Sequence, residues 1–100
     1  MTQVDKKVII SNLIDFLTHE PEVRRIVIFG SFLTSPNPHD LDVAVFQDSN
    51  EKYLPLSLKY RRKTRSIAEK IPLDIFPLRA DAGESFFMDE IAKGRVIYER

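Results

Sequence analysis

The 100-residue sequence contains no cysteine and no tryptophan. Without cysteine the chain cannot use thiol catalysis, thiolate-bound zinc or disulfide bonds, and it is compatible with a reducing compartment. No apolar run approaches the roughly 18 residues needed to span a bilayer, and the N-terminus lacks the layout of a signal peptide. We therefore expect a cytoplasmic protein without membrane contacts.

Neither sign of charge is in excess, because fifteen basic side chains balance fifteen acidic ones. A net charge of zero argues against a protein that coats nucleic acid or anionic membrane, so we expect no direct nucleic-acid binding. Hydrophobic residues make up 43% of the chain and charged residues 30%, which is ordinary for a globular domain. We expect one domain, residues 1–100, whose core needs no disulfide or metal.

Apolar periodicity and turn residues predict alternating helices and strands. Helices are expected over 6–19, over 54–70 and before Gly94, with a short helical turn over 32–34. Strands are expected over 23–29, 40–46, 73–76 and 95–98, with Pro77 ending the third. This order predicts an α/β (α+β) fold with a mixed sheet of about four strands covered by helices.

The most informative segment runs from residue 30 to residue 42. Gly30 and Ser31 follow an apolar strand, where a small-residue turn lets the backbone approach an anion such as phosphate. Asp40 and Asp42 open the next strand, and alternation places both on one face. Adjacent carboxylates repel unless a cation lies between them, and Mg²⁺ shares such oxygen ligands with substrate phosphates. The segment therefore predicts a nucleotide site.

A third carboxylate, Asp74, lies inside the short apolar strand 73–76, where it is costly unless it faces solvent or a cation. If that strand lies beside the Asp40–Asp42 strand, three carboxylates converge, which is enough for two Mg²⁺ ions. Each feature taken alone also has an ordinary explanation. Gly30 is then a turn glycine, the Asp pair is solvated at a strand start, and Asp74 is exposed on a sheet edge.

A basic run occupies residues 59–65 of the long predicted helix. Residues three or four apart share a helix face, so Arg65 neighbours both Arg61 and Arg62 and the three could clamp an anion. A solvated helix face is the ordinary interpretation. The alternative is contact with a triphosphate, an RNA or an acidic partner.

Together, three motifs carry a family resemblance: Phe29-Gly30-Ser31, Asp40-Leu41-Asp42 and Leu73-Asp74-Ile75. The chain resembles the DNA polymerase β-like nucleotidyltransferase superfamily, and more narrowly the minimal nucleotidyltransferase (MNT) proteins of prokaryotes, over nearly its whole length. It departs from the family pattern in a short spacer of eight residues between Ser31 and Asp40. Phe32 also replaces the Arg that often follows Gly-Ser, and His39 precedes the first Asp.

The resemblance implies transfer of AMP from ATP to an acceptor hydroxyl, with Mg²⁺ as cofactor. In the roles it implies, Asp40 and Asp42 ligate both Mg²⁺ ions. Asp74 holds the acceptor-side ion and helps to deprotonate the hydroxyl, and Gly30 and Ser31 bind the β and γ phosphates.

The resemblance also implies a partner, because minimal members pair with a separately encoded all-helical HEPN protein. In such toxin–antitoxin pairs the nucleotidyltransferase is the antitoxin, and some members AMPylate a tyrosine of the toxin. A homo- or hetero-oligomer is compatible with the sequence. Two alternatives stay open: a non-catalytic module that neutralises the HEPN protein by contact, and a subunit of a small-molecule nucleotidyltransferase such as an aminoglycoside-modifying enzyme.

Overall fold

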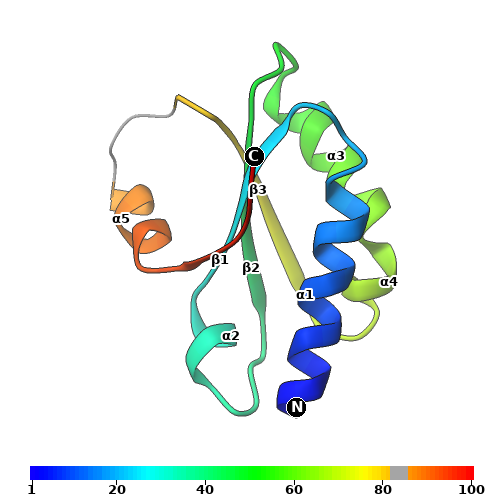
Figure 1. Ribbon diagram of the computed structural model, residues 1–100, viewed down its shortest axis with the longest axis vertical. Helices are drawn as coiled ribbons and strands as arrows, with labels where there is room; N and C mark the ends of the chain where they lie inside the picture. The colour runs from blue at the N-terminus through cyan, green and yellow to red at the C-terminus, as the bar shows by residue number, and fades with distance from the viewer. Residues whose placement is uncertain (82–85) are drawn as a thin grey trace.

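The computed structural model describes residues 1–81 and 86–100, and it shows a four-stranded sheet with helices on both faces (Figure 1). The strands are β1 (Val23–Phe29), β2 (Leu41–Gln47), β3 (Leu73–Arg79) and β4 (Arg95–Glu99), in the spatial order β3-β2-β1-β4. Strand β1 pairs antiparallel with β2 and β4, whereas β2 and β3 run parallel. The predicted mixed sheet of four strands is thus confirmed.

One face of the sheet packs against the helices α1 (Gln3–Leu17), α3 (Tyr53–Lys63) and α4 (Arg65–Ala68), which lie to its right in Figure 1. Because side chains alternate along a strand, every second strand residue enters this core. The core includes the buried side chains of Leu13, Leu17, Ile26, Ile28, Leu41, Val43, Val45, Leu56, Tyr60, Ile67 and Ile75. Among the described residues, this is the larger of the two clusters of buried apolar side chains.

The opposite face is only partly covered, by α5 (Phe86–Ala92). Ile91 of this helix packs with Val27 and Phe29 of β1, and with Ala44 and Phe46 of β2. The strand residues between the core positions point to this second face. Asp42 precedes Ala44 by two residues, so its side chain belongs to the second face. None of the helices within residues 1–81 and 86–100 combines the length and the apolar character needed to cross a bilayer.

Helix α1 begins three residues earlier than the apolar periodicity predicts, at Gln3 instead of residue 6. A capping box explains the earlier start, because the backbone N–H of Asp5 donates to the Thr2 hydroxyl while the Thr2 N–H donates to the Asp5 carboxylate. The sequence also predicts a capping box of Asp81 with Glu84 at the start of the last helix, and Glu84 lies outside the described residues.

The single helix predicted over 54–70 is wrong, because the structure divides this segment into α3 and α4 at Thr64. The Thr64 side chain is fully buried, and its hydroxyl donates to the Tyr60 carbonyl at 2.8 Å. Such a back-bond from a threonine competes with helical hydrogen bonding and bends a helix. Periodicity alone does not reveal this break, since the apolar spacing continues through it.

Several strand boundaries also differ from the sequence prediction, and two of them concern Pro77 and Asp40. Pro77 does not end β3, which continues to Arg79, because β3 is an edge strand that pairs only with β2 among the described strands. A proline is tolerated there since its missing N–H removes no ladder bond from a central strand. Strand β2 begins at Leu41, which leaves Asp40 immediately outside it.

Candidate active site

A backbone hydrogen bond holds the first residues of β2 and β3 side by side. The backbone N–H of Leu41 donates to the Pro72 carbonyl at 2.9 Å, and the parallel register then pairs Asp42 directly with Asp74. Neighbouring strands lie roughly 4.8 Å apart, so these two side chains project next to each other from the partly covered face. The predicted meeting of Asp42 with Asp74 is therefore present in the fold.

Gly30 closes this site from the side of β1. Phe29, the last residue of β1, pairs with Asp42, and Gly30 then turns the chain with φ 81° and ψ −159° into the short helix α2 (Ser31–Thr34). A Cβ on Gly30 would lie 2.7 Å from Oδ2 of Asp42. Only glycine combines this positive φ with so close an approach to the carboxylate. Gly30 and Ser31 are both exposed beside Asp42.

Asp40 is the third predicted carboxylate, and it lies on the exposed loop immediately before β2. The prediction that it belongs to the strand is wrong, although its charge still acts on Asp42. The structure thus arranges the three carboxylates as an Asp42–Asp74 pair with Asp40 beside it.

The pair is electrostatically unfavourable without a cation. Burial raises the pKa of Asp42 above its ordinary value of 3.8, and the negative charges of Asp74 and Asp40 raise that pKa further. Desolvation and like charge both disfavour the ionised form of a carboxyl group. The fold therefore disfavours the ionised form of the Asp42 side chain.

The donor set suits a hard divalent cation such as Mg²⁺, because every side-chain ligand offered is a carboxylate oxygen. A dication beside the group would offset the repulsion that raises the pKa of Asp42. Within residues 1–81 and 86–100, no three His, Asp or Glu side chains are already arranged around one metal position. Metal binding by Asp40, Asp42 and Asp74 therefore stays a prediction.

Two of the three departures from the family motif, Phe32 and His39, have different places in the structure. Phe32, which stands where an Arg often occurs, is 1% exposed and belongs to the core, with the Lys6 ammonium 5.4 Å from its ring centre. That ammonium also donates to the Ser35 carbonyl at 2.7 Å. His39 is exposed on the loop before Asp40.

Aromatic side chains lie beside the carboxylates, a feature that the sequence analysis did not assign to the site. The ring centres of Phe29 and Phe76 are 5.9 Å apart. Phe29 pairs with Asp42 across the sheet, and Phe76 follows Asp74 by two residues, so both rings share the face of the carboxylates. The alternation Asp74-x-Phe76 is the sequence signal that could have placed an aromatic ring beside the carboxylates.

The family match covers most of the chain. Residues 11–100 match the family described as "Polymerase beta, Nucleotidyltransferase". The chain therefore belongs to this nucleotidyltransferase family, as its four-stranded mixed sheet also indicates. No curated protein sequence gives a significant match.

Two solved structures share the fold. The first is described as a tri-AMPylated Shewanella oneidensis HEPN toxin in complex with MNT antitoxin. It matches with a TM-score of 0.71 and 18% identity, over 95% of this chain and 73% of the other. The second, a mutant of the toxin–antitoxin MntA–HpeT, matches with a TM-score of 0.64 and 13% identity, over 91% of this chain and 73% of the other. At such identities the likeness demonstrates a common fold.

Proposed function

We propose that the chain is a Mg²⁺-dependent nucleotidyltransferase that transfers AMP from ATP to a hydroxyl group of a partner protein. The observation that carries the proposal is the pairing of Asp42 with Asp74 next to Gly30. This arrangement places a glycine bend beside a carboxylate pair, and such a pair can hold the metal ions used in in-line phosphoryl chemistry. Membership of the nucleotidyltransferase family supports the reaction type.

The residues have separate tasks in this proposal. Gly30 and Ser31 hold the β and γ phosphates with the backbone at the start of α2. Asp40 and Asp42 would hold the Mg²⁺ ions that accompany the triphosphate. Mg²⁺, when bound, neutralises phosphate charge and lowers the pKa of the attacking hydroxyl. The hydroxyl oxygen bonds to the α-phosphorus as the bond to the α–β bridging oxygen breaks and pyrophosphate leaves. Asp74 accepts the hydroxyl proton and passes it to water.

The partner in this proposal is an all-helical HEPN toxin, with the chain as its antitoxin. Both solved structures of similar fold are named as toxin–antitoxin pairs, and one of them carries an AMPylated HEPN toxin. ATP as the donor follows from that AMP group.

The test is an intact-mass measurement of the HEPN protein after incubation with the chain, ATP and Mg²⁺. We expect a mass increase of one or more AMP units, and label transfer from α-labelled but not γ-labelled ATP. Asp42→Asn and Asp74→Asn should each abolish the increase, because each removes one carboxylate of the pair. Asp15→Asn, on the exposed surface of α1, is the matched control and should leave transfer intact.

A different result would contradict the proposal. If wild-type chain neutralises the toxin without any mass increase, and Asp42→Asn neutralises it equally well, the chain acts by contact alone.

A further inference from the structure

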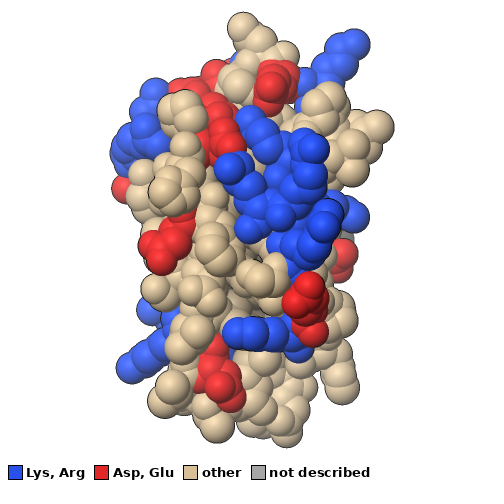
Figure 2. Space-filling model, turned by 90° about the vertical axis from the view of Figure 1, so that its right-hand side faces the viewer, with Lys and Arg blue, Asp and Glu red and all other residues tan. Residues whose placement is uncertain are grey.

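Three arginines surround a hollow where α3 and α4 meet the start of β3. Arg61, Arg62 and Arg65 line it together with Leu58, Thr64, Ala68 and Leu73, and its volume is about 340 Å³. We call this feature the arginine hollow. It lies at the break between α3 and α4, beside the first residue of β3. The face of α3 and α4 carries a continuous area of Lys and Arg side chains with acidic residues around it (Figure 2).

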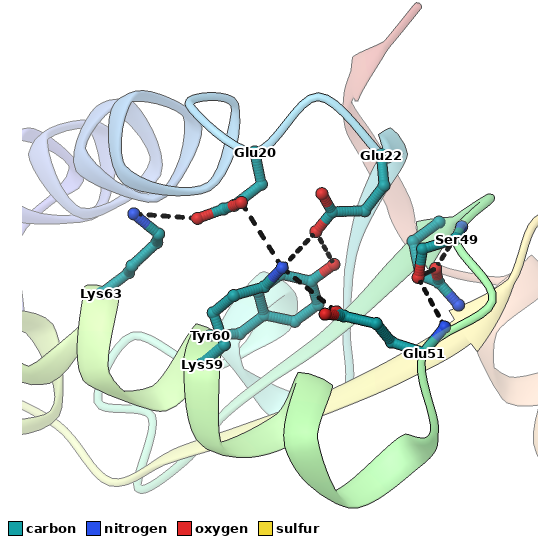
Figure 3. Close-up of polar contacts among 8 residues, drawn as sticks. Glu20, Glu22, Ser49, Glu51, Lys59, Tyr60 and Lys63 are labelled. Carbon is teal, nitrogen blue, oxygen red and sulfur yellow. Dashed lines mark hydrogen bonds and ion pairs between the residues drawn. The ribbon is translucent and has the colours of Figure 1, made fainter.

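The neighbouring lysines form ion pairs with glutamates, whereas, among the described residues, the three arginines do not. Lys59 contacts Glu20, Glu22 and Glu51 at 3.4, 3.0 and 3.3 Å, and Lys63 contacts Glu20 at 3.0 Å (Figure 3). In the described part of the chain, none of the three arginines of the hollow has an ion pair or a side-chain hydrogen bond. The hollow therefore gathers three exposed positive charges that no acidic side chain of the described residues pairs with.

The helix dipole accounts for only part of this cluster. Arg61 and Arg62 lie in the last turn of α3, where cations complement the partial negative charge of a helix C-terminus. Arg65 lies in α4, a helix of only four residues in which it is both the first residue and part of the last turn, so its position gives it no clear dipole stabilisation. Mutual repulsion of three guanidinium groups around one space is relieved by an anion inside it.

We propose that the arginine hollow is a second binding site, which takes a phosphate group of a nucleotide. A guanidinium offers paired N–H donors that match phosphate oxygens bidentately. The combined positive charge of three guanidinium groups is larger than the charge of a single carboxylate. The hollow therefore suits a phosphate group, which presents several oxygens. The hollow has the size of small-ligand sites, which start at about 300 Å³, and Leu58, Ala68 and Leu73 add apolar contact for a base.

The hollow and the candidate active site adjoin the same edge strand, β3, from its opposite faces. Leu73 lines the hollow, and the next residue, Asp74, points to the other face of the same edge strand. A phosphate held in the hollow could come from free AMP or from an acceptor that already carries AMP. The second source rests on the proposed function, whereas phosphate binding itself does not.

The experiment is an NMR titration of the full chain in EDTA with AMP, pyrophosphate and the amide of O-adenylyl-tyrosine. We expect the amide signals of Thr64 and Leu73 to shift on addition of at least one nucleotide. Tighter binding of AMP identifies the free nucleotide, and tighter binding of the adenylylated tyrosine identifies the modified acceptor. Arg62→Gln/Arg65→Gln should weaken binding at least about tenfold, because it removes two charge-assisted contacts.

Matched variants make the result specific. Lys7→Gln/Lys93→Gln removes the same net charge from exposed positions on α1 and after α5, and it should leave binding unchanged. Arg62→Lys/Arg65→Lys keeps the charge but loses the fork, so it should bind more weakly than wild type. Asp42→Asn should abolish AMP transfer yet leave this titration intact, which separates failure of the proposed function from failure of this site.

The proposal is overturned if no nucleotide shifts Thr64 and Leu73, or if Arg62→Gln/Arg65→Gln binds as tightly as wild type. It is also overturned if acetate competes as effectively as AMP at equal concentration, because the hollow would then be a carboxylate site for an acidic protein segment.

Discussion

Gly30 lies so close to the Asp42 side chain that a Cβ atom added to Gly30 would be 2.7 Å from Oδ2 of Asp42. Gly30 also has φ 81°, a conformation that side chains rarely adopt. The bend after β1 and the carboxylate on β2 therefore depend on the same glycine, and a change at one alters the other.

Gly30→Ala tests this dependence. We expect a loss of about 1–3 kcal/mol in the free energy of unfolding, from backbone strain and the contact with Asp42, together with loss of ATP binding. Urea denaturation and ATP titration measure the two effects. Gly30→Ala in an Asp42→Ala background relieves the contact but keeps the strain, so the double mutant should lose less than the sum of its single mutants. If Gly30→Ala is as stable as wild type, the assigned backbone strain and close contact with Asp42 are contradicted.

Asp42→Asn should stabilise the fold at neutral pH in EDTA. Because burial and the charges of Asp74 and Asp40 raise the pKa of Asp42, its contribution to stability is fully present below the ordinary value of 3.8. That contribution is lost as the pH rises through the folded pKa. Asparagine removes the charge, so we expect a Tm higher by a few degrees. Thermal melts measure it.

The control for this variant is Asp15→Asn, on the exposed face of α1, which should leave Tm unchanged. Mg²⁺ should raise the Tm of wild type more than that of Asp42→Asn, because a ligand that binds only the folded state stabilises it. A lower Tm for Asp42→Asn in EDTA would show that the ionised carboxylate is stabilised by something other than a metal.

Much of the site could be predicted because its parts depend on short-range rules. Strand alternation places Asp42 away from the core, and a glycine directly after an apolar strand indicates a turn. The sequence predicts that Asp74 lies near Asp42 only if their two strands are neighbours, and no local pattern shows which strands are adjacent. The structure supplies that answer through the parallel β2–β3 register.

The rest depended on burial and on contacts that the apolar pattern of the sequence does not encode. The break at Thr64 follows from burial of its hydroxyl against the Tyr60 carbonyl, which periodicity does not encode. Strand β3 continues past Pro77 only because it is at the sheet edge. The division of the basic run into paired lysines and unpaired arginines likewise depends on where Glu20 and Glu22 lie in space.

Lys63→Met should reduce the acid sensitivity of the fold. The hydrogen bond from Lys63 lowers the pKa of Glu20 below its ordinary value of 4.5, burial opposes this shift, and the charge of Lys59 adds to it. The stability that Glu20 contributes is therefore present above 4.5 and is lost as the pH falls through the folded pKa. We expect a loss of about 0.5–1 kcal/mol at neutral pH, since the pair is partly exposed.

Urea midpoints collected from neutral pH to below 4.5 measure this effect, and the wild-type curve should fall more steeply than that of Lys63→Met. Lys93→Met removes a lysine whose only ion pair among the described residues is the 3.9 Å contact with Glu90. It should reproduce the wild-type pH dependence. Parallel curves for wild type and Lys63→Met would exclude the assigned role of Lys63.

Tyr60→Phe should destabilise the link between α3 and the segment before β1. The fully buried Tyr60 donates its hydroxyl hydrogen to Oε2 of Glu22 at 2.8 Å, and the ammonium of Lys59 lies 3.0 Å from the same oxygen (Figure 3). Burial, followed by the hydrogen bond to Glu22, raises the pKa of Tyr60, so the phenol stays a neutral donor. Phenylalanine keeps the ring packing and removes only this bond.

We expect Tyr60→Phe to lower the free energy of unfolding by about 1.5–3 kcal/mol, because the lost bond ends on a charged acceptor. Urea denaturation measures it. Tyr53→Phe is the matched control, since Tyr53 is 54% exposed on the same helix and should change stability by less than about 0.5 kcal/mol. If both variants behave alike, the Tyr60–Glu22 bond does not hold α3 in place, and the Lys59 and Lys63 ion pairs do so without it.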